Sequence, residues 1–388
     1  MCCARPWTPC CDDAGLRAVT NRVARLRSGF GDAGIDALLV TDPNNIRYLS
    51  GFTGSSGWLF VGADDAATVL LTDGRYSNQA PAEIAGHQAT IDVDPAFRQR
   101  DERLAQLAAA HPRIGLEAAS ITWADQQRVA AALGSSGAEA EAEVVATSGL
   151  VEALREVKDA NELAAIERAV ACADHALAET MGLLAPGRTE REVAHALDAA
   201  MRAHGATGPG YETIVAAGPN AALPHARPTD RALAEGDLVV IDVGALVDGY
   251  RSDMTRTFVI GSATPTQERM LDVVTEAQAA GVARVAPGVP TAEVDAACRS
   301  VIADAGWGDA FSHGTGHGVG LAIHEAPAVG ERAAATLQPG HVITVEPGVY
   351  LPEHGGVRVE DLVLVTDDGH RVLTNSPKQP YAPYGHYS

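Results

Sequence analysis

The feature that most constrains the fold of this chain is an internal duplication in its C-terminal part. Segment 185–205, APGRTEREVAHALDAAMRAHG, aligns without gaps to segment 286–306, APGVPTAEVDAACRSVIADAG. Each copy predicts a Pro-Gly turn, a helix of about four turns and a glycine stop, followed by a β-rich segment. Two related halves are therefore predicted, and a site shared between them is the natural place for chemistry. The identical pairs are Ala185/Ala286, Pro186/Pro287, Gly187/Gly288, Glu192/Glu293, Val193/Val294, Ala196/Ala297 and Gly205/Gly306.

Composition limits the class of protein and its partners. A length of 388 residues suits roughly two or three domains, and a hydrophobic content of 46% is enough for buried cores. The formal net charge of -21 argues against nucleic acid or an anionic membrane surface as the main partner. No apolar run approaches the roughly 20 residues needed to cross a membrane, and the first residues lack the pattern of a secretory signal. The expected location is the cytoplasm.

Upstream of the duplication, helix and strand patterns alternate at a spacing typical of a small α/β domain. Residues 14–36 predict a helix that ends at Gly34, and residues 36–42 predict a buried strand. Trp58–Val61 and Ala67–Leu71 predict a hairpin. Helices and strands continue to alternate up to the start of the second region.

These patterns divide the chain into three parts. Residues 1–13 are predicted to be a disordered leader, residues 14–153 the small α/β domain, and residues 154–388 the domain that contains the duplication. The cysteines of the leader do not have the spacing of a zinc ribbon, and we assign them no role. They are Cys2, Cys3, Cys10 and Cys11.

An acid-bearing hairpin is predicted after the first copy of the repeat. Residues 238–245, LVVIDVGA, and residues 250–260, YRSDMTRTFVI, predict strands joined by a turn at Asp248-Gly249. The turn would bring Asp242 to within about one residue of the position opposite Asp253, so both carboxylates could reach one ion. A carboxylate among Leu, Val and Ile side chains is costly unless it is paired, hydrogen-bonded or bound to a metal. The alternative is an exposed Asp at the end of a strand.

A second acid-bearing hairpin follows the second copy. Residues 342–350, VITVEPGVY, and residues 357–365, VRVEDLVLV, predict strands that carry Glu346 and Glu360. Four carboxylates would balance two divalent cations bridged by a hydroxide. Such an oxygen-rich set favours Mn²⁺ over a structural zinc, with Zn²⁺, Co²⁺ and Fe²⁺ as alternatives. Two metals about 3.5–4 Å apart can generate a hydroxide nucleophile and polarise the bond that it attacks.

Between the hairpins lies a glycine-rich segment with three histidines, FSHGTGHGVGLAIHE at residues 311–325. Glycine lets the backbone pass close to a bound group, and imidazole is a frequent metal ligand. By themselves, His313, His317 and His324 are compatible with a metal site or with ordinary hydrogen-bonded side chains. Glu325 directly follows the last of them, and one interpretation is that it braces that imidazole.

Four of these motifs resemble a known family. DVGALVDGYRSDMTRTF, HGTGHGVGLAIHE, TVEPGVY and GVRVED are similar to motifs of the metal-dependent pita-bread peptidases, which include aminopeptidase P, prolidase and, more distantly, methionine aminopeptidase. NIRYLSGFTGSSG and DGRY resemble the N-terminal domain of that family. The resemblance implies an α+β fold, with a creatinase/prolidase-type N-terminal domain and a pita-bread catalytic domain that contains a pseudo-twofold duplication. It also implies a homodimer.

The resemblance implies roles for individual residues. Asp253 and Glu360 would bridge two divalent metal ions, and Glu346 would also shuttle a proton. His225, in ALPHARPTD, would lie on the substrate side, and His324 would stabilise the tetrahedral intermediate. The implied metal ligands are Asp242, Asp253, His317, Glu346 and Glu360, and the implied substrate-binding residues are His313, Tyr350 and Arg358.

The leading functional expectation is a dinuclear metallopeptidase that removes the N-terminal residue from peptides with proline second, an Xaa-Pro aminopeptidase. Proline lacks an N–H group and has a fixed φ, so its peptide bond calls for a specialised pocket. The nearest alternative is an Xaa-Pro dipeptidase, or prolidase. A metal-free relative of the creatinase kind, or a binding protein on the same fold, is a third possibility. All five implied ligand positions are filled here, which argues against that third reading.

Overall fold

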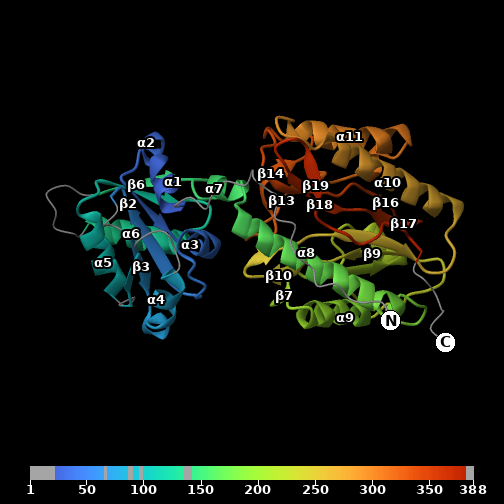
Figure 1. The fold of residues 1–388 in the computed structure, drawn as a ribbon, viewed down its shortest axis with the longest axis horizontal. Helices are drawn as coiled ribbons and strands as arrows, with labels where there is room; N and C mark the ends of the chain where they lie inside the picture. Colours follow the sequence, from blue (N-terminus) through green and yellow to red (C-terminus); the bar gives the residue numbers. More distant parts are fainter. Residues whose placement is uncertain (1–21, 65–67, 86–90, 96–98, 135–141, 382–388) are drawn as a thin grey trace, which may run out of the picture.

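The computed structural model describes residues 22–64, 68–85, 91–95, 99–134 and 142–381 (Figure 1). The predicted leader and its cysteines lie outside these residues. Two bodies are joined by a short helical segment, α7 (Glu152–Glu156), and Figure 1 shows the first body in blue to cyan and the second in green to red. None of the described helices combines the length and the apolar character that a membrane span requires.

The first body is built on one six-stranded sheet with the order β4-β3-β2-β1-β5-β6. The predicted hairpin is confirmed, because β2 and β3 pair in antiparallel fashion. β1 pairs in parallel with β5, and β5 pairs in parallel with β6, so this part of the sheet has the parallel pairing of an α/β domain. The strands are β1 (Ala37–Val40), β2 (Gly57–Gly62), β3 (Thr68–Thr72), β4 (Asp92–Asp94), β5 (Arg113–Glu117) and β6 (Glu143–Thr147).

Short helices cover this sheet. The single helix predicted up to Gly34 is two helices in the described residues, α1 (Arg22–Ser28) and α2 (Phe30–Ala33), which are separated at Gly29. Gly34 ends the second with a φ of 66°, as predicted for a glycine stop. The other helices are α3 (Pro43–Ser50), α4 (Gln79–Ile84), α5 (Arg100–Ala108) and α6 (Trp123–Gly134).

The duplication appears in the second body as two equivalent helices. α9 (Glu190–Ala203) and α11 (Thr291–Asp304) each have 14 residues. The turn glycines before them and the stop glycines after them all have positive φ, between 82° and 103°. α9 packs beside α8 (Ala160–Thr180), and α11 packs beside α10 (Pro265–Arg284). Figure 1 shows the strands of this body between the two helix pairs, so the predicted fold class is confirmed.

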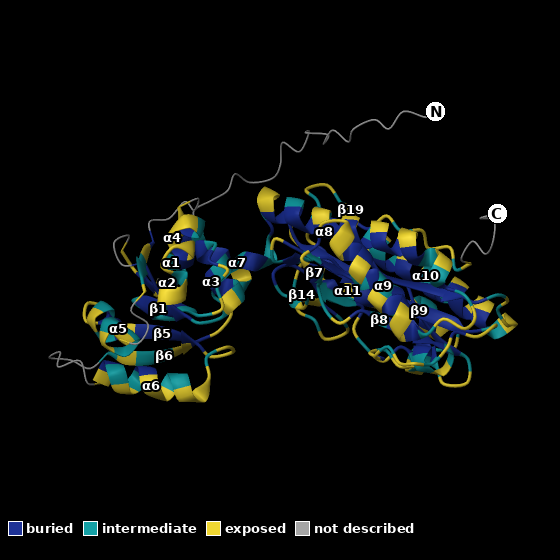
Figure 2. Ribbon diagram, turned by 90° about the horizontal axis from the view of Figure 1, so that it is seen from below, coloured by how far each residue is buried: buried dark blue, intermediate teal, exposed yellow. Residues whose placement is uncertain are grey.

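Two sheets of the second body, which we call the inner sheets, contain the strands that end or begin beside the acids. The first has the order β12-β9-β8 and the second has the order β14-β13-β15-β18-β19. The first contains β8 (Ile214–Ala217), β9 (Leu238–Asp242) and β12 (Thr255–Val259). The second contains β13 (Gly316–Gly318), β14 (Glu325–Val329), β15 (Val342–Val345), β18 (Asp361–Val365) and β19 (His370–Val372). In Figure 2 the strands are dark blue, whereas the outer faces of α8 and α9 are yellow.

Each of the four strands predicted to carry an acid is in fact broken in two at or beside that acid. The first hairpin leaves its inner sheet after Asp242 and continues in an outer sheet of β7 (Gly208–Pro209), β10 (Ala245–Val247) and β11 (Tyr250–Arg251). The predicted turn at Asp248-Gly249 lies in this outer sheet.

The physical cause of the first break is a close backbone crossing. A Cβ added at Gly244 would lie 2.0 Å from the carbonyl oxygen of Ser252, so the two strands are too close there for a regular ladder. The register pairs Asp242 with Thr255. The expectation that Asp242 lies within about one residue of the position opposite Asp253 is therefore wrong. Asp253 lies beyond the end of the ladder.

The second hairpin breaks in the same way. Its outer strands are β16 (Gly348–Leu351) and β17 (Gly355–Arg358), which form a separate two-stranded sheet. Pro347 follows Glu346 and has no N–H to donate to a ladder, which accounts for the break on that side. The breaks leave the four acids at the points where the chain passes from inner to outer sheet.

Candidate active site

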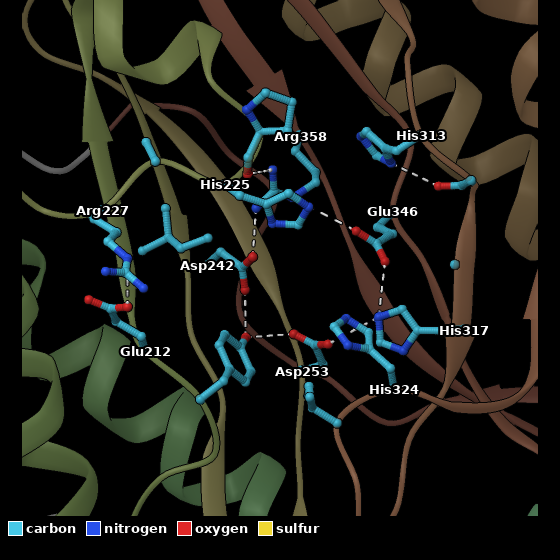
Figure 3. A pocket seen from close by; sticks show the side chains of 17 residues that line it. Glu212, His225, Arg227, Asp242, Asp253, His313, His317, His324, Glu346 and Arg358 are labelled. Carbon is cyan, nitrogen blue, oxygen red and sulfur yellow. Dashed lines mark hydrogen bonds and ion pairs between the residues drawn. The ribbon is translucent and has the colours of Figure 1, made fainter. Parts of the chain in front are cut away.

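A cavity of about 490 Å³ opens between the two halves, and both halves line it (Figure 3). The first half contributes the segment 224–227, which follows β8, together with the acids at the ends of β9 and β12. The second half contributes histidines of the glycine-rich segment and Glu346. The structure therefore brings the two predicted hairpins and the histidine segment to one place.

Three acids form a cluster here, and two of them, Asp242 and Asp253, line the cavity. Carboxylate oxygens of Asp242, Asp253 and Glu360 all lie within 4.8 Å of one another. Burial raises the pKa of Asp253 and that of Glu360 well above their ordinary values, and the neighbouring carboxylates raise both further. Glu360 comes from the second half and the other two from the first, so the cluster is shared between the halves.

The cluster has the properties of a cation site. The buried Oε1 of Glu360 has no hydrogen-bond partner among the described residues. The Tyr211 hydroxyl lies 2.5 Å from Oδ1 of Asp242 and 2.5 Å from Oδ1 of Asp253, yet it has only one proton to donate. Buried carboxylates that repel one another and have an oxygen without a donor are stabilised by a bound cation. These residues therefore fit a divalent metal.

His317 and Glu346 adjoin the cluster. Nε2 of His317 lies 3.3 Å from Oε1 of Glu346 and 3.6 Å from Oδ2 of Asp253. Nδ1 of His317 lies 3.1 Å from the carbonyl oxygen of Gly318, to which it can donate its proton, and this leaves Nε2 free to bind a metal. Burial alone would raise the pKa of Glu346, but the hydrogen bond and charge of His317, with the charge of Arg358, lower it to about 2.

Arg358 and Tyr350 connect the acids to His313. The Arg358 guanidinium is buried and donates to Oδ2 of Asp242 over 2.6 Å and to the Tyr350 hydroxyl over 2.9 Å. The Tyr350 hydroxyl in turn lies 3.0 Å from Nε2 of His313. His313, which lines the cavity, thus contacts Tyr350, and it is not one of the residues of the acid cluster.

The two remaining predicted histidines lie at opposite sides of the cavity. The rings of His324 and His317 are 4.4 Å apart, edge to face. Burial lowers the pKa of His324, and the neighbouring His317 lowers it further, so its neutral form is favoured. His225 is exposed and lines the cavity from the first half, as Figure 3 shows. All the predicted histidines of the site therefore face one cavity.

Sequence patterns missed several residues of the site. Tyr211 lies in GPGY, between α9 and β8, in a stretch without periodicity that could have identified it. Arg227 and Glu212 form an ion pair of 3.1 Å on the cavity wall. The Thr344 hydroxyl links two of the predicted site residues. It accepts a hydrogen bond of 3.0 Å from the backbone N–H of His317 and donates one of 3.1 Å to Oε1 of Glu346.

Comparisons with known proteins agree with this geometry. The model of metallopeptidase family M24 matches residues 164–367. The model of the creatinase/prolidase N-terminal domain matches residues 22–157. An Xaa-Pro dipeptidase of Pyrococcus horikoshii is 34% identical over 345 residues, which are 89% of this chain and 94% of that protein.

Solved structures are similar over almost the whole chain. An Xaa-Pro dipeptidase from Bacillus anthracis has a TM-score of 0.87 and 36% identity, covering 93% of this chain and 98% of its own. An X-Pro aminopeptidase from Thermotoga maritima has a TM-score of 0.81 and 32% identity, covering 89% of this chain and 97% of its own.

Proposed function

This chain belongs to metallopeptidase family M24, and on that premise we propose that it is an Xaa-Pro dipeptidase that uses divalent metal ions. The observation that carries the proposal is the acid cluster shared between the halves, beside a cavity that four histidines line. The sequence motifs favoured an Xaa-Pro aminopeptidase. The dipeptidase alternative has the better support, because relatives of nearly full length and higher similarity carry that activity in their names.

The residues that would hold two divalent ions are Asp242, Asp253, His317, Glu346 and Glu360. Support comes from the mixed donor set of four carboxylates and one imidazole, which favours Mn²⁺. Asp253 and Glu360 are the proposed bridging acids, since both belong to the close cluster and both are strongly buried. When bound, the ions supply Lewis acidity and an activated water for hydrolysis.

The proposed proton carrier is Glu346. Glu346 lines the cavity, its Oε1 accepts a hydrogen bond of 3.1 Å from the Thr344 hydroxyl, and its Oε2 lies 4.0 Å from Nε of Arg358. A fixed carboxylate in this position accepts a proton from water and returns it to the departing proline nitrogen. That nitrogen must be protonated to leave, because it would otherwise depart as a strongly basic amide anion.

The histidines are proposed to act on the substrate. His324 and His225 line the cavity from opposite halves, where imidazole N–H groups can donate hydrogen bonds to the carbonyl oxygen of the scissile bond. His313, Tyr350 and Arg358 are the proposed substrate-binding residues: His313 and Arg358 line the cavity, and the Tyr350 hydroxyl contacts both. Arg358 also fixes Asp242 through a direct ion pair of 2.6 Å. As the family resemblance implies, we also propose a homodimer, which light scattering of the purified protein would test. A cytoplasmic location is a separate proposal.

Hydrolysis assays on matched peptides test the proposal. After supplementation with Mn²⁺, the protein is expected to cleave Gly-Pro and Ala-Pro and to leave Gly-Pro-Ala largely intact. Equal turnover of dipeptide and tripeptide would make it an aminopeptidase. A protein that cleaves neither with Mn²⁺, Zn²⁺, Co²⁺ or Fe²⁺ would contradict the proposed function. In His317→Ala, loss of a ligand is expected to lower kcat by at least about 100-fold.

A further inference from the structure

Glu325 directly follows His324 and begins β14, and its carboxylate is buried inside the turn that presents His324. Its Oε1 accepts a hydrogen bond of 2.8 Å from the backbone N–H of Ala322. A Cβ added at Gly320 would lie 2.6 Å from Oε2, so the carboxylate fills the space inside the turn. Glu325 therefore fixes the backbone on which His324 is carried.

The charge of Glu325 is neutralised by two cations that lie in and just after α7, the segment that joins the two bodies. Arg155 of α7 forms an ion pair with Oε1, and Nζ of Lys158 lies 3.4 Å from Oε2. The side chains of Arg155 and Glu325 are each 6% exposed, and that of Lys158 is 1% exposed. A buried carboxylate with two buried cations is strongly held, and removal of one partner leaves an uncompensated charge.

Arg155 is itself held by the first body. Its NH1 donates to Oδ1 of Asn45 over 2.7 Å, and Nδ2 of Asn45 donates to Oε1 of Glu117 over 2.7 Å. Glu117 ends β5, and its Oε2 accepts from the backbone N–H of Asp42 over 2.9 Å. A continuous chain of polar contacts thus runs from the sheet of the first body to the turn that carries His324.

Apolar packing follows the same route. Val319 and Leu321, in the segment between His317 and His324, belong to the same buried cluster as Ile46 and Leu49 of α3. The backbone of this segment is also held on its other side, where the N–H of Arg251 donates to the carbonyl oxygen of Gly320 over 3.0 Å. The first body is therefore part of the support of the second body's histidine segment.

We propose that Glu325 is a positioning residue whose pairing with Arg155 couples the first body to the placement of His324. The inference rests on the proposed function, in which His324 acts on the substrate carbonyl. It goes beyond that function because it assigns the first body a part in catalysis. Removal of the Arg155 guanidinium would change the position of an imidazole without removing any proposed metal ligand.

Four variants of the full-length chain test this inference. Arg155→Met removes the ion pair, and Arg155→Lys restores a charge. The matched control is Arg22→Met, because Arg22 of α1 also joins the two bodies, through a 2.7 Å ion pair with Asp159 at the start of α8. That pair does not touch the His324 turn. Glu325→Gln is a second probe, since it keeps an acceptor for Ala322 and removes the charge.

With Gly-Pro as substrate, Arg155→Met is expected to lower kcat on the order of 10- to 100-fold, with a smaller change in KM and unchanged metal content. Arg155→Lys should recover part of kcat, and Arg22→Met should keep most of it. Equal losses of kcat in Arg155→Met and Arg22→Met would overturn the inference, because the effect would then be general loosening of the two bodies. An unchanged kcat in Arg155→Met would overturn it as well.

Hydrogen exchange makes the test independent of activity. Peptides covering residues 318–325 are expected to exchange faster in Arg155→Met than in wild type and Arg22→Met. If wild type cleaves no Xaa-Pro peptide, the proposed function fails, and this exchange difference still decides whether the first body holds the turn. Exchange of this segment that is the same in all three proteins would refute the coupling.

Discussion

The two halves of the second body place their acids at equivalent points of the fold but surround them with different partners. Each half has one acid at the end of an inner strand, Asp242 as the last residue of β9 and Glu346 directly after β15. Each has another just before the returning strand, Asp253 before β12 and Glu360 before β18. The first half adds the Tyr211 hydroxyl to its acids, whereas the second adds the imidazole of His317.

The supporting helices differ in the same way. In the first half, buried Glu190 of α9 accepts from the backbone N–H of Ala217 and of Thr229, so it holds the loop that carries His225. In the second half, Asp295 of α11 accepts from the backbone and side chain of Thr315. Its neighbour Arg299 donates to the carbonyl oxygen of His313.

This comparison shows which features the duplication preserves. The scaffold of helix, inner strand and outer hairpin is common to both halves, while the donor atoms at the site have diverged. Neither half contains the whole acid cluster, so the site depends on both. The predictions below test that division, beginning with the acids that are equivalent in the two halves.

Substitution of the two proposed bridging acids should have the largest effect. Asp253→Asn and Glu360→Gln keep the shape of the side chain but remove its charge from the cluster. We expect each to lower kcat/KM for Gly-Pro on the order of 1000-fold, because the metal contribution to transition-state stabilisation is several kcal/mol. Steady-state kinetics with saturating Mn²⁺ measures this. A loss confined to one of the two variants would break the equivalence of the halves.

The two supporting helices should show comparable losses of stability. Glu190→Ala leaves the buried N–H of Ala217 and the partly buried N–H of Thr229 without their acceptor, and Asp295→Ala does the same for Thr315. We expect each to lower the free energy of unfolding by roughly 3 kcal/mol, measured by urea denaturation. Variants as stable as wild type would show that these acids do not hold the loops.

The two halves have different titratable residues directly before β9 and β15, and the pH dependence of the free energy of unfolding should reveal this difference. In the first half this residue is Asp237, which pairs with Arg231 over 2.6 Å. In the second half it is His341, and burial, with the charge of Lys158, lowers its pKa from 6.5 to about 4. The unfolded chain therefore binds more protons than the folded chain between these pH values.

Protonation of His341 in the unfolded chain therefore does not lower the free energy of unfolding above about pH 6.5, and lowers it progressively as the pH falls towards 4. The slope contributed by His341 is at most about 1.4 kcal/mol per pH unit. His341→Gln should flatten this part of the profile relative to wild type in chemical denaturation across pH 4 to 7. A variant profile parallel to that of wild type would contradict a buried, neutral His341.

The smallest effect is expected at the ion pair of Arg227 and Glu212, on the first-half wall of the cavity. The Arg227 side chain is 82% exposed, and an exposed pair contributes at most about 1 kcal/mol. Arg227→Ala should leave the Tm unchanged and alter KM for Gly-Pro by only a few fold. A loss of more than about 10-fold in kcat/KM would reveal a charged substrate contact supplied by the first half alone.

Local sequence patterns were sufficient to predict the duplication, the presence of an acid in each of the four strand segments, and the turn at Asp248-Gly249. Asp248 and Gly249 have φ of 48° and 79°, as a tight hairpin turn requires. The breaks in the strands were not predictable from alternation, because they depend on tertiary approach. At the crossing, a Cβ added at Gly244 would clash with both the backbone of Ser252 and the ring of Tyr211, so only glycine fits there.

Long-range partners also escaped prediction for a physical reason. Arg155 and Glu325 are far apart in the sequence, and neither lies in a periodic pattern that specifies the other. The sequence suggested only that Glu325 braces its neighbour. The source of the opposing charge, in the segment that joins the two bodies, became visible only when the fold placed α7 against β14.

The central claim is that acids from both halves hold the metals together, and the metal content of the purified protein tests it most directly. After reconstitution with Mn²⁺ and removal of free ions, wild type is predicted to retain about two ions per chain. Asp253→Asn and Glu360→Gln should each retain clearly fewer, although their substitutions lie in different halves. Wild-type protein without bound metal, or a Glu360→Gln variant with the full wild-type content, would contradict the account.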